Sequence, residues 1–180
     1  PGSLPGLEER TVVIGSLYPA HVPYYVYVAT FFPNPVAGVA GVTGLQFGLN
    51  YNNGAAAGVD LFSWTLCATL EFQTPAPVWP ASGAGTLITW NGCQTTSTLA
   101  PAGYFYMGAY TPDTFKLTPR PVDGLAKSAN CASTETIIPP GDLGFAAFGG
   151  AEGCNPCLAD CAPVPVESTT WSSVKSLYRR

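Results

Sequence analysis

The chain has 180 residues, of which 10% are charged and 47% apolar, and its formal net charge is −4. A single domain of this length can bury a sizeable core, but so few charges cover its surface only if other polar residues or another subunit contribute. Because no basic stripe is present to neutralise phosphates, we expect no nucleic-acid partner. No apolar run approaches the roughly 18 residues of a membrane span. Residues 1–6 also lack the features of a signal peptide, so we expect a mature or trimmed chain.

Residues 1–18 are expected to form an N-terminal extension. Within it, the apolar run from Thr11 to Leu17 indicates a short strand, and Pro19 ends it. Since this strand is set apart from the body, we expect Val12, Val13 and Ile14 to pair with the sheet edge of a neighbouring subunit.

The body is expected to span residues 19–150 and to be built around the run Tyr24–Phe32. Nine residues pass there without a charge, glycine or proline, and nearly all are aromatic or β-branched. Because both faces of this run are apolar, it is predicted to be the central strand of the fold, buried between two layers.

Further strands follow at short spacing. In Gly44–Tyr51 the apolar residues alternate, so Leu45, Phe47, Leu49 and Tyr51 should point inward and Gln46, Gly48 and Asn50 outward. The other predicted strands are Phe62–Glu71, Gly85–Trp90 with a tight turn at Asn91-Gly92, Ala102–Tyr110 and Thr114–Thr118 joined as a hairpin, and Thr134–Ile138. Short strands punctuated by Gly and Pro, with no long amphipathic helix, predict an all-β fold: a disulfide-bonded antiparallel β-sandwich.

Six cysteines in a chain rich in Gly and Pro indicate disulfides and an oxidising compartment. All six, Cys67, Cys93, Cys131, Cys154, Cys157 and Cys161, are expected to be oxidised, with Cys67–Cys93 as one bridge. Cys131 is expected to pair with one of the last three, which lie in a cysteine-rich loop over residues 151–167. A metal site would need Cys131 as a fourth ligand to that cluster, and a redox pair would need a following helix, so structural disulfides are favoured and no metal or cofactor is expected.

The C-terminal tail, residues 168–180, breaks the β pattern. Trp171, Val174, Leu177 and Tyr178 fall on one helical face, which predicts a short C-terminal helical tail. So short a helix is marginal alone in water and should form only by docking that face on another surface.

The tail sequence Thr169-Thr170-Trp171, followed by Val174, Lys175 and Leu177-Tyr178-Arg179, resembles the ending of a group of poorly characterised secreted bacterial proteins from environmental genomes. Their tails run approximately Glu-x-Thr-Thr-Trp-Gly-x-Ile/Val-Lys-x-Leu-Tyr-Arg, and Ser172 stands here where Gly is usual. Those proteins also carry a late cysteine cluster and β-rich bodies. The resemblance implies an extracellular β-sandwich and brings no known activity.

The inventory of catalytic residues is thin, so no enzymatic activity is expected. His21 is the only imidazole, and no nucleophile motif accompanies it. The 11 acids are scattered rather than paired as in a glycosidase. One binding arrangement is conceivable: Tyr104, Tyr106 and Tyr110 with Trp79 and Trp90 as an aromatic platform for sugars, against the plainer interpretation that these rings are core or cross-strand pairs.

Two functions are consistent with these observations. The first is a structural subunit of an extracellular bacterial filament that assembles with copies of itself through its terminal extensions. The second is a secreted or surface-attached binding module, an adhesin or carbohydrate binder, with an anchoring C-terminal tail. In both cases the protein is expected outside the cell or on its surface, with surface carbohydrate as a possible partner.

Overall fold

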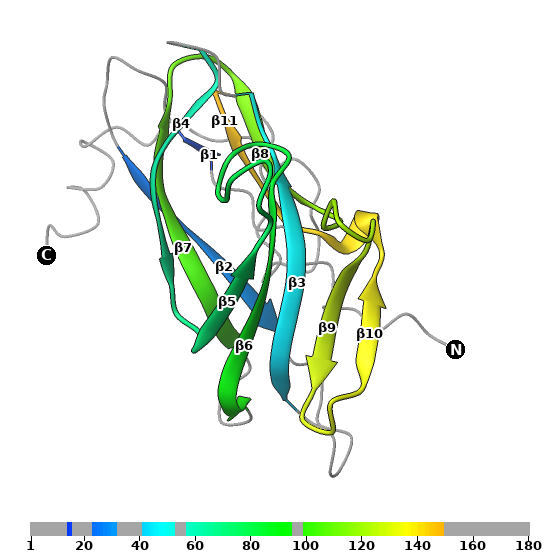
Figure 1. The fold of residues 1–180 in the computed structure, drawn as a ribbon. Helices are drawn as coiled ribbons and strands as arrows, with labels where there is room; N and C mark the ends of the chain where they lie inside the picture. Colours follow the sequence, from blue (N-terminus) through cyan, green and yellow to red (C-terminus); the bar gives the residue numbers. More distant parts are fainter. Residues whose placement is uncertain (1–13, 16–22, 32–40, 53–56, 95–98, 150–180) are drawn as a thin grey trace, which may run out of the picture.

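The computed structural model describes residues 14–15, 23–31, 41–52, 57–94 and 99–149, and these form two β-sheets packed face to face (Figure 1). Within these ranges the only helical element is a 3-10 turn at Pro140–Asp142. The all-β sandwich expected from the strand pattern is therefore confirmed. The predicted cysteine-rich loop and C-terminal helical tail lie outside the described residues.

The smaller sheet has three antiparallel strands and the larger one has eight. The smaller sheet runs β2 (Tyr24–Phe31), β7 (Leu99–Ala109), β4 (Val59–Leu66). The main path of the larger sheet is β1 (Ile14–Gly15), β11 (Phe145–Phe148), β8 (Asp113–Thr118), β3 (Val42–Asn50), β6 (Gly85–Gln94), β5 (Leu70–Gln73). A hairpin of β9 (Ala126–Asn130) and β10 (Glu135–Ile138) joins the larger sheet through β3.

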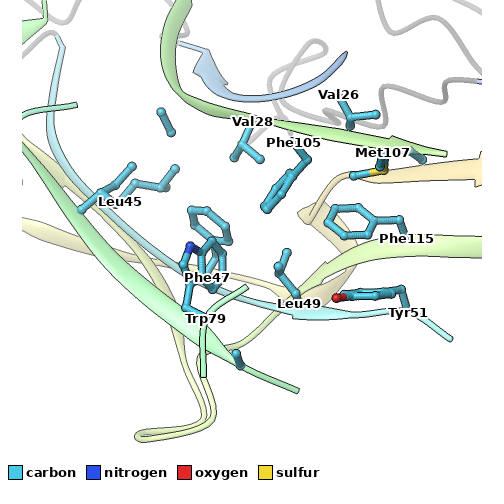
Figure 2. Packing of buried hydrophobic residues seen from close by; sticks show 14 of the residues in the cluster. Val26, Val28, Leu45, Phe47, Leu49, Tyr51, Trp79, Phe105, Met107 and Phe115 are labelled. Carbon is cyan, nitrogen blue, oxygen red and sulfur yellow. The ribbon is translucent and has the colours of Figure 1, made fainter. Parts of the chain in front are cut away.

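The core fills the space between the sheets with aromatic and branched side chains. Figure 2 shows Phe105 and Met107 of the smaller sheet facing Phe47, Leu49 and Phe115 of the larger sheet, and all five are buried. The rings of Phe105 and Phe115 lie 4.9 Å apart in the edge-on geometry that aromatic quadrupoles favour. Burial of these large apolar surfaces is the main force that holds the two sheets together.

The run Tyr24–Phe32, expected to be the central strand, lies instead at an edge. β2 pairs with β7 and with no other described strand, and β7 occupies the middle of the smaller sheet. Val26 and Val28 face the core, whereas Tyr25 and Tyr27 are each 60% exposed. The prediction was wrong because tyrosine was counted as buried apolar surface on both faces, while here its rings line the outer face.

The chain also changes sheet at two places where a continuous strand or a hairpin was predicted. The predicted strand Phe62–Glu71 is divided: β4 belongs to the smaller sheet and β5 to the larger. At the crossing, the backbone N–H of Cys67 donates to Ala102 of the smaller sheet and that of Thr69 donates to Thr89 of the larger. The predicted hairpin at Thr111–Asp113 is likewise a crossing, from β7 to β8.

Of two predictions for single strands, one is wrong and the other is confirmed in part. No tight turn forms at Asn91-Gly92, because β6 continues through it to Gln94. The alternation of β3 is confirmed on the inner face, where Leu45, Phe47, Leu49 and Tyr51 are buried. On the opposite face only Asn50 is exposed as predicted, while Gln46 and Gly48 are buried. Gln46 is covered because its Nε2 donates to Asp123 at 2.7 Å and its Oε1 accepts a hydrogen bond from Arg120.

Candidate functional site

The described residues contain no group of three His, Cys, Asp or Glu side chains that could hold a metal ion. His21 lies outside the described residues. No helix in the described part of the chain is long and apolar enough to cross a membrane.

The cysteines pair differently from the prediction. The disulfide joins Cys93, near the end of β6, to Cys131, after β9, at a sequence separation of 38. Cys67 carries an exposed free thiol, so the predicted Cys67–Cys93 bridge and the oxidation of Cys67 are wrong. The physical reason is that β4 ends in the smaller sheet, whereas Cys93 lies in the larger one. The predicted pairing of Cys131 with one of the last three cysteines is wrong as well, because Cys93 is its partner. Cys154, Cys157 and Cys161 lie outside the described residues.

Of the residues expected to serve assembly, the structure describes Ile14. Ile14 and Gly15 pair in parallel with Ala147 and Phe148 of β11 in the same chain. This pairing counts against the exchange of that strand between subunits. Val12, Val13 and the tail residues Trp171, Val174, Leu177 and Tyr178 lie outside the described residues.

The aromatic platform considered for Tyr104, Tyr106, Tyr110, Trp79 and Trp90 is only partly assembled, and the favoured interpretation as core residues and cross-strand pairs describes Trp79, Trp90, Tyr104 and Tyr106. Trp79 and Trp90 are buried in the core, at 4% and 9% exposure, so they cannot meet a ligand. Tyr110 follows the end of β7, and its backbone N–H donates to Gly58. Tyr104 and Tyr106 do lie on the outer face of the smaller sheet, where they contact rings from the two neighbouring strands.

These contacts form a continuous group of five rings, called here the aromatic face: Tyr25, Tyr27, Phe62, Tyr104 and Tyr106. Tyr25 is paired in register with Tyr106, and Tyr27 with Tyr104, so two of the contacts are direct cross-strand pairs. Phe62 joins from β4 at an irregularity between Leu61 and Ser63, and its ring lies 5.1 Å from that of Tyr106. Tyr25, Tyr27 and Phe62 are 60%, 60% and 49% exposed.

The surroundings of the aromatic face are polar but almost without charge. The three strands of the smaller sheet contain a single charged residue, Asp60 near the start of β4. Ser63 and Thr65 are exposed and pair in register with Tyr106 and Tyr104, so their hydroxyls border the rings. The face therefore offers flat apolar rings, phenolic hydroxyls and aliphatic hydroxyls on a rigid sheet.

Tyr25, Tyr27 and Phe62 were not predicted to belong to this face. A signal was present in the alternation of Tyr25, Val26, Tyr27 and Val28, in which one side is purely aliphatic and the other purely tyrosine. Tyrosine keeps a polar tip that prefers water, so the tyrosine side is the one to place outside.

A second apolar feature lies on the other sheet. Leu70 and Phe72 of β5 are each 55% exposed, on the side of the strand opposite Glu71. Glu71 itself points inward, where its carboxylate accepts hydrogen bonds from Trp64 at 2.9 Å and Thr86 at 3.0 Å. Phe72 is thus an aromatic residue of comparable exposure away from the aromatic face.

The known proteins that resemble this chain support its fold but not a function. No family model matches the chain, and no curated protein matches it. One similar solved structure is a cohesin module from the family 33 glycoside hydrolase of Clostridium perfringens ATCC13124, with a TM-score of 0.51 and 10% sequence identity. The similarity covers 77% of this chain and 90% of the module. At that identity the likeness shows the β-sandwich fold alone.

Proposed function

We propose that this protein is an extracellular binding module without catalytic activity, and that it recognises its ligand with the aromatic face. The observation that carries the proposal is the contiguous group of five rings, three of them about half exposed or more, on the outer side of a rigid sheet. Contiguous exposed apolar patches on soluble proteins mark interaction sites.

The arrangement of the rings supports binding rather than a role in folding alone. Each ring contacts at least one other, so its position is set before a ligand arrives and less conformational freedom is lost on binding. The core already has its own aromatic residues, including Phe47, Phe105 and Phe115. The outer rings therefore serve a surface that faces away from that core.

The Cys93–Cys131 disulfide supports an extracellular location, because such bridges persist in oxidising compartments. A cohesin module of a glycoside hydrolase has the same β-sandwich fold, so a modular role is consistent with this fold. The filament hypothesis loses part of its proposed mechanism, since Ile14 pairs within its own chain. We therefore favour the binding module over the filament subunit.

Depletion of the full-length protein from solution by insoluble material tests this function. The panel is cellulose, chitin, starch granules, xylan, peptidoglycan sacculi and collagen-coated beads. We expect at least one material to retain the protein. The Tyr25→Ala/Tyr27→Ala variant should bind that material with an affinity at least about tenfold lower. The matched control is Phe72→Ala, which removes an equally exposed ring from the other sheet and should bind as the unmodified protein does.

Circular dichroism melting of each variant separates lost binding from lost folding. The function is wrong if no material retains the protein, or if Phe72→Ala weakens retention as much as the double variant does.

A further inference from the structure

We infer that the ligand of the aromatic face is a neutral polysaccharide chain that lies across the smaller sheet. This inference rests on the proposed function and adds the chemical class of the ligand and its direction on the surface. Three features of the described residues carry it: the order of the rings, the near absence of charge, and the hydroxyl groups.

The contacts between the five rings form one unbranched series, called here the row: two adjacent Tyr–Tyr pairs of β2 and β7, and then Phe62. The series alternates between β2 and β7 before it reaches β4. Successive ring centroids are 5.3 Å apart for Tyr27–Tyr104, 5.6 Å for Tyr104–Tyr25, 5.0 Å for Tyr25–Tyr106 and 5.1 Å for Tyr106–Phe62. The row therefore runs obliquely over the sheet, with Tyr27 of β2 at one end and Phe62 of β4 at the other. A surface with regularly repeated rings fits a ligand with regularly repeated units.

Sugar rings are suited to such a row. One face of a pyranose presents C–H groups with slight positive charge, and the face of an aromatic ring carries the negative side of its quadrupole. Stacking also removes apolar surface from water on both partners. Each aromatic ring can therefore act as one subsite for one sugar unit, and an extended chain of sugars can occupy several subsites together.

The charge of the face selects against most other polymers. The three strands contain no Lys or Arg, so a nucleic acid or an acidic polysaccharide would find no cation to neutralise it. Asp60 is their single acid, and it lies next to Gly108 in register, beyond the end of the row. A neutral polysaccharide carries no charge that would have to be neutralised on such a surface.

The hydroxyl groups distinguish a sugar from an apolar protein surface. Four of the five rings are tyrosines, and Ser63 and Thr65 stand beside them. If a second copy of the chain or an apolar segment covered the row, the phenolic hydroxyls would be buried and would each need a new partner. A polyhydroxylated ligand brings donors and acceptors to each of them.

Affinity electrophoresis of the full-length protein tests the inference. The gels contain a neutral polysaccharide (hydroxyethyl cellulose, xyloglucan, galactomannan or soluble starch) or an acidic one (alginate or heparin). We expect retardation by at least one neutral polymer and none by the acidic ones. Raising the salt from about 0.1 M to about 1 M should leave the retardation unchanged, because no ion pair is involved.

Variants along the row test its direction. Tyr27→Ala at the β2 end and Phe62→Ala at the β4 end should each weaken retardation about tenfold, while Phe72→Ala should not. Tyr27→Phe, which keeps the ring, should lose less than Tyr27→Ala. In calorimetry with oligosaccharides of the retarding polymer, the affinity should rise with the number of sugar units up to a plateau. For Tyr27→Ala and for Phe62→Ala, this plateau should be reached with a shorter oligosaccharide.

Several outcomes would overturn the ligand class while leaving the binding function intact. Retention only by collagen beads, by acidic polymers or in a salt-dependent manner would show that the face binds another class of ligand. If sedimentation shows a dimer that Tyr25→Ala/Tyr27→Ala dissolves, the occupant is a second copy. If Trp171→Ala in the full chain increases binding to the insoluble panel, the chain's own C-terminal tail covers the face. Retention by no material at all contradicts the proposed function as well.

Discussion

Replacing Gly103 with alanine should be the most damaging small change in the smaller sheet. Gly103 lies in the central strand β7, and an added Cβ would stand 2.5 Å from Cζ2 of Trp64 and 2.6 Å from the carbonyl oxygen of Thr65. Real Cβ atoms do not approach other atoms so closely, and one of the two obstacles is backbone. The Trp64 ring or the β4–β7 pairing must therefore move.

Trp64 cannot move cheaply, because contacts hold it on several sides. Its ring lies 4.4 Å from that of Phe105 and 5.4 Å from that of Trp79, and its Nε1 donates to Glu71 at 2.9 Å. Forcing an extra methyl into a packed core costs about 1–3 kcal/mol. Losing a hydrogen bond to a charged group adds about 1.5–3 kcal/mol. We therefore expect Gly103→Ala to lower the free energy of unfolding by roughly 3 kcal/mol or more, which is a fall in Tm of about 10 °C for a chain of this size.

Gly108→Ala on the same strand is the matched control. Its added Cβ would meet the Phe62 ring at 3.7 Å, an ordinary contact, and Gly→Ala replacement without strain changes stability by about 0.4–1 kcal/mol in the favourable direction. Urea unfolding followed by tryptophan fluorescence measures both variants, since Trp79 and Trp90 are buried in the native state. If the free energy of unfolding of Gly103→Ala lies within about 0.5 kcal/mol of that of the unmodified protein, the substitution behaves like one at the surface. That result would refute the close packing of Trp64 against β7.

Three further predictions concern single groups. Burial, with a contribution from Asp60, raises the pKa of Tyr51 above its ordinary 10.0, so the folded state holds this proton more tightly than the unfolded state. The stability contributed by the protonated Tyr51 side chain is present below pH 10 and is lost as the pH rises through the raised pKa. The Tm of Tyr51→Phe should therefore fall less at alkaline pH than the Tm of the unmodified protein. Peptide mapping without reduction should show Cys93 linked to Cys131, and iodoacetamide should label Cys67 in the native protein; Cys131→Ser should cost about 3–4 kcal/mol for a loop of this length. Glu71→Ala should cost about 2–3 kcal/mol in urea unfolding, because Trp64 and the buried Thr86 lose their shared acceptor, and Glu71→Gln should cost less.

The buried face of a strand could be predicted from the sequence where one face was apolar and the other polar. In β3 the inward residues Phe47 and Leu49 are apolar and the outward Asn50 is polar, so alternation alone oriented the strand correctly. Alternation failed to show that Gln46 would be covered, because its cover comes from Arg120, Asp123 and Leu125, more than 70 residues later in the chain. A local pattern reports the face of a residue and carries no information about a distant segment that folds over it.

The assignment of strands to sheets was beyond the sequence for a related reason. β4 and β5 are separated by three residues, and nothing in Cys67, Ala68 or Thr69 breaks a strand as proline or glycine does. The crossing is determined by partners: Ala102 binds one side of this short segment and Thr89 the other. The wrong cysteine pairing followed directly, since a bridge from Cys67 to Cys93 assumed that the two flanking strands were neighbours in one sheet.

The aromatic face shows how the same error concealed the surface on which the proposed function rests. Treating Tyr25 and Tyr27 as core residues placed β2 in the centre. The platform was then considered from Tyr104, Tyr106 and Tyr110 with Trp79 and Trp90, and the two tryptophans are in fact buried. The distinction is physical: a tyrosine at the surface keeps its hydroxyl in water while its ring packs against a cross-strand neighbour, as Tyr27 does against Tyr104. Trp79, enclosed by Phe47, Trp64 and Phe105, contributes ring area to the core instead. In this sandwich, the alternation of valine with tyrosine therefore marks an edge strand with one buried and one exposed face, not a strand buried on both faces.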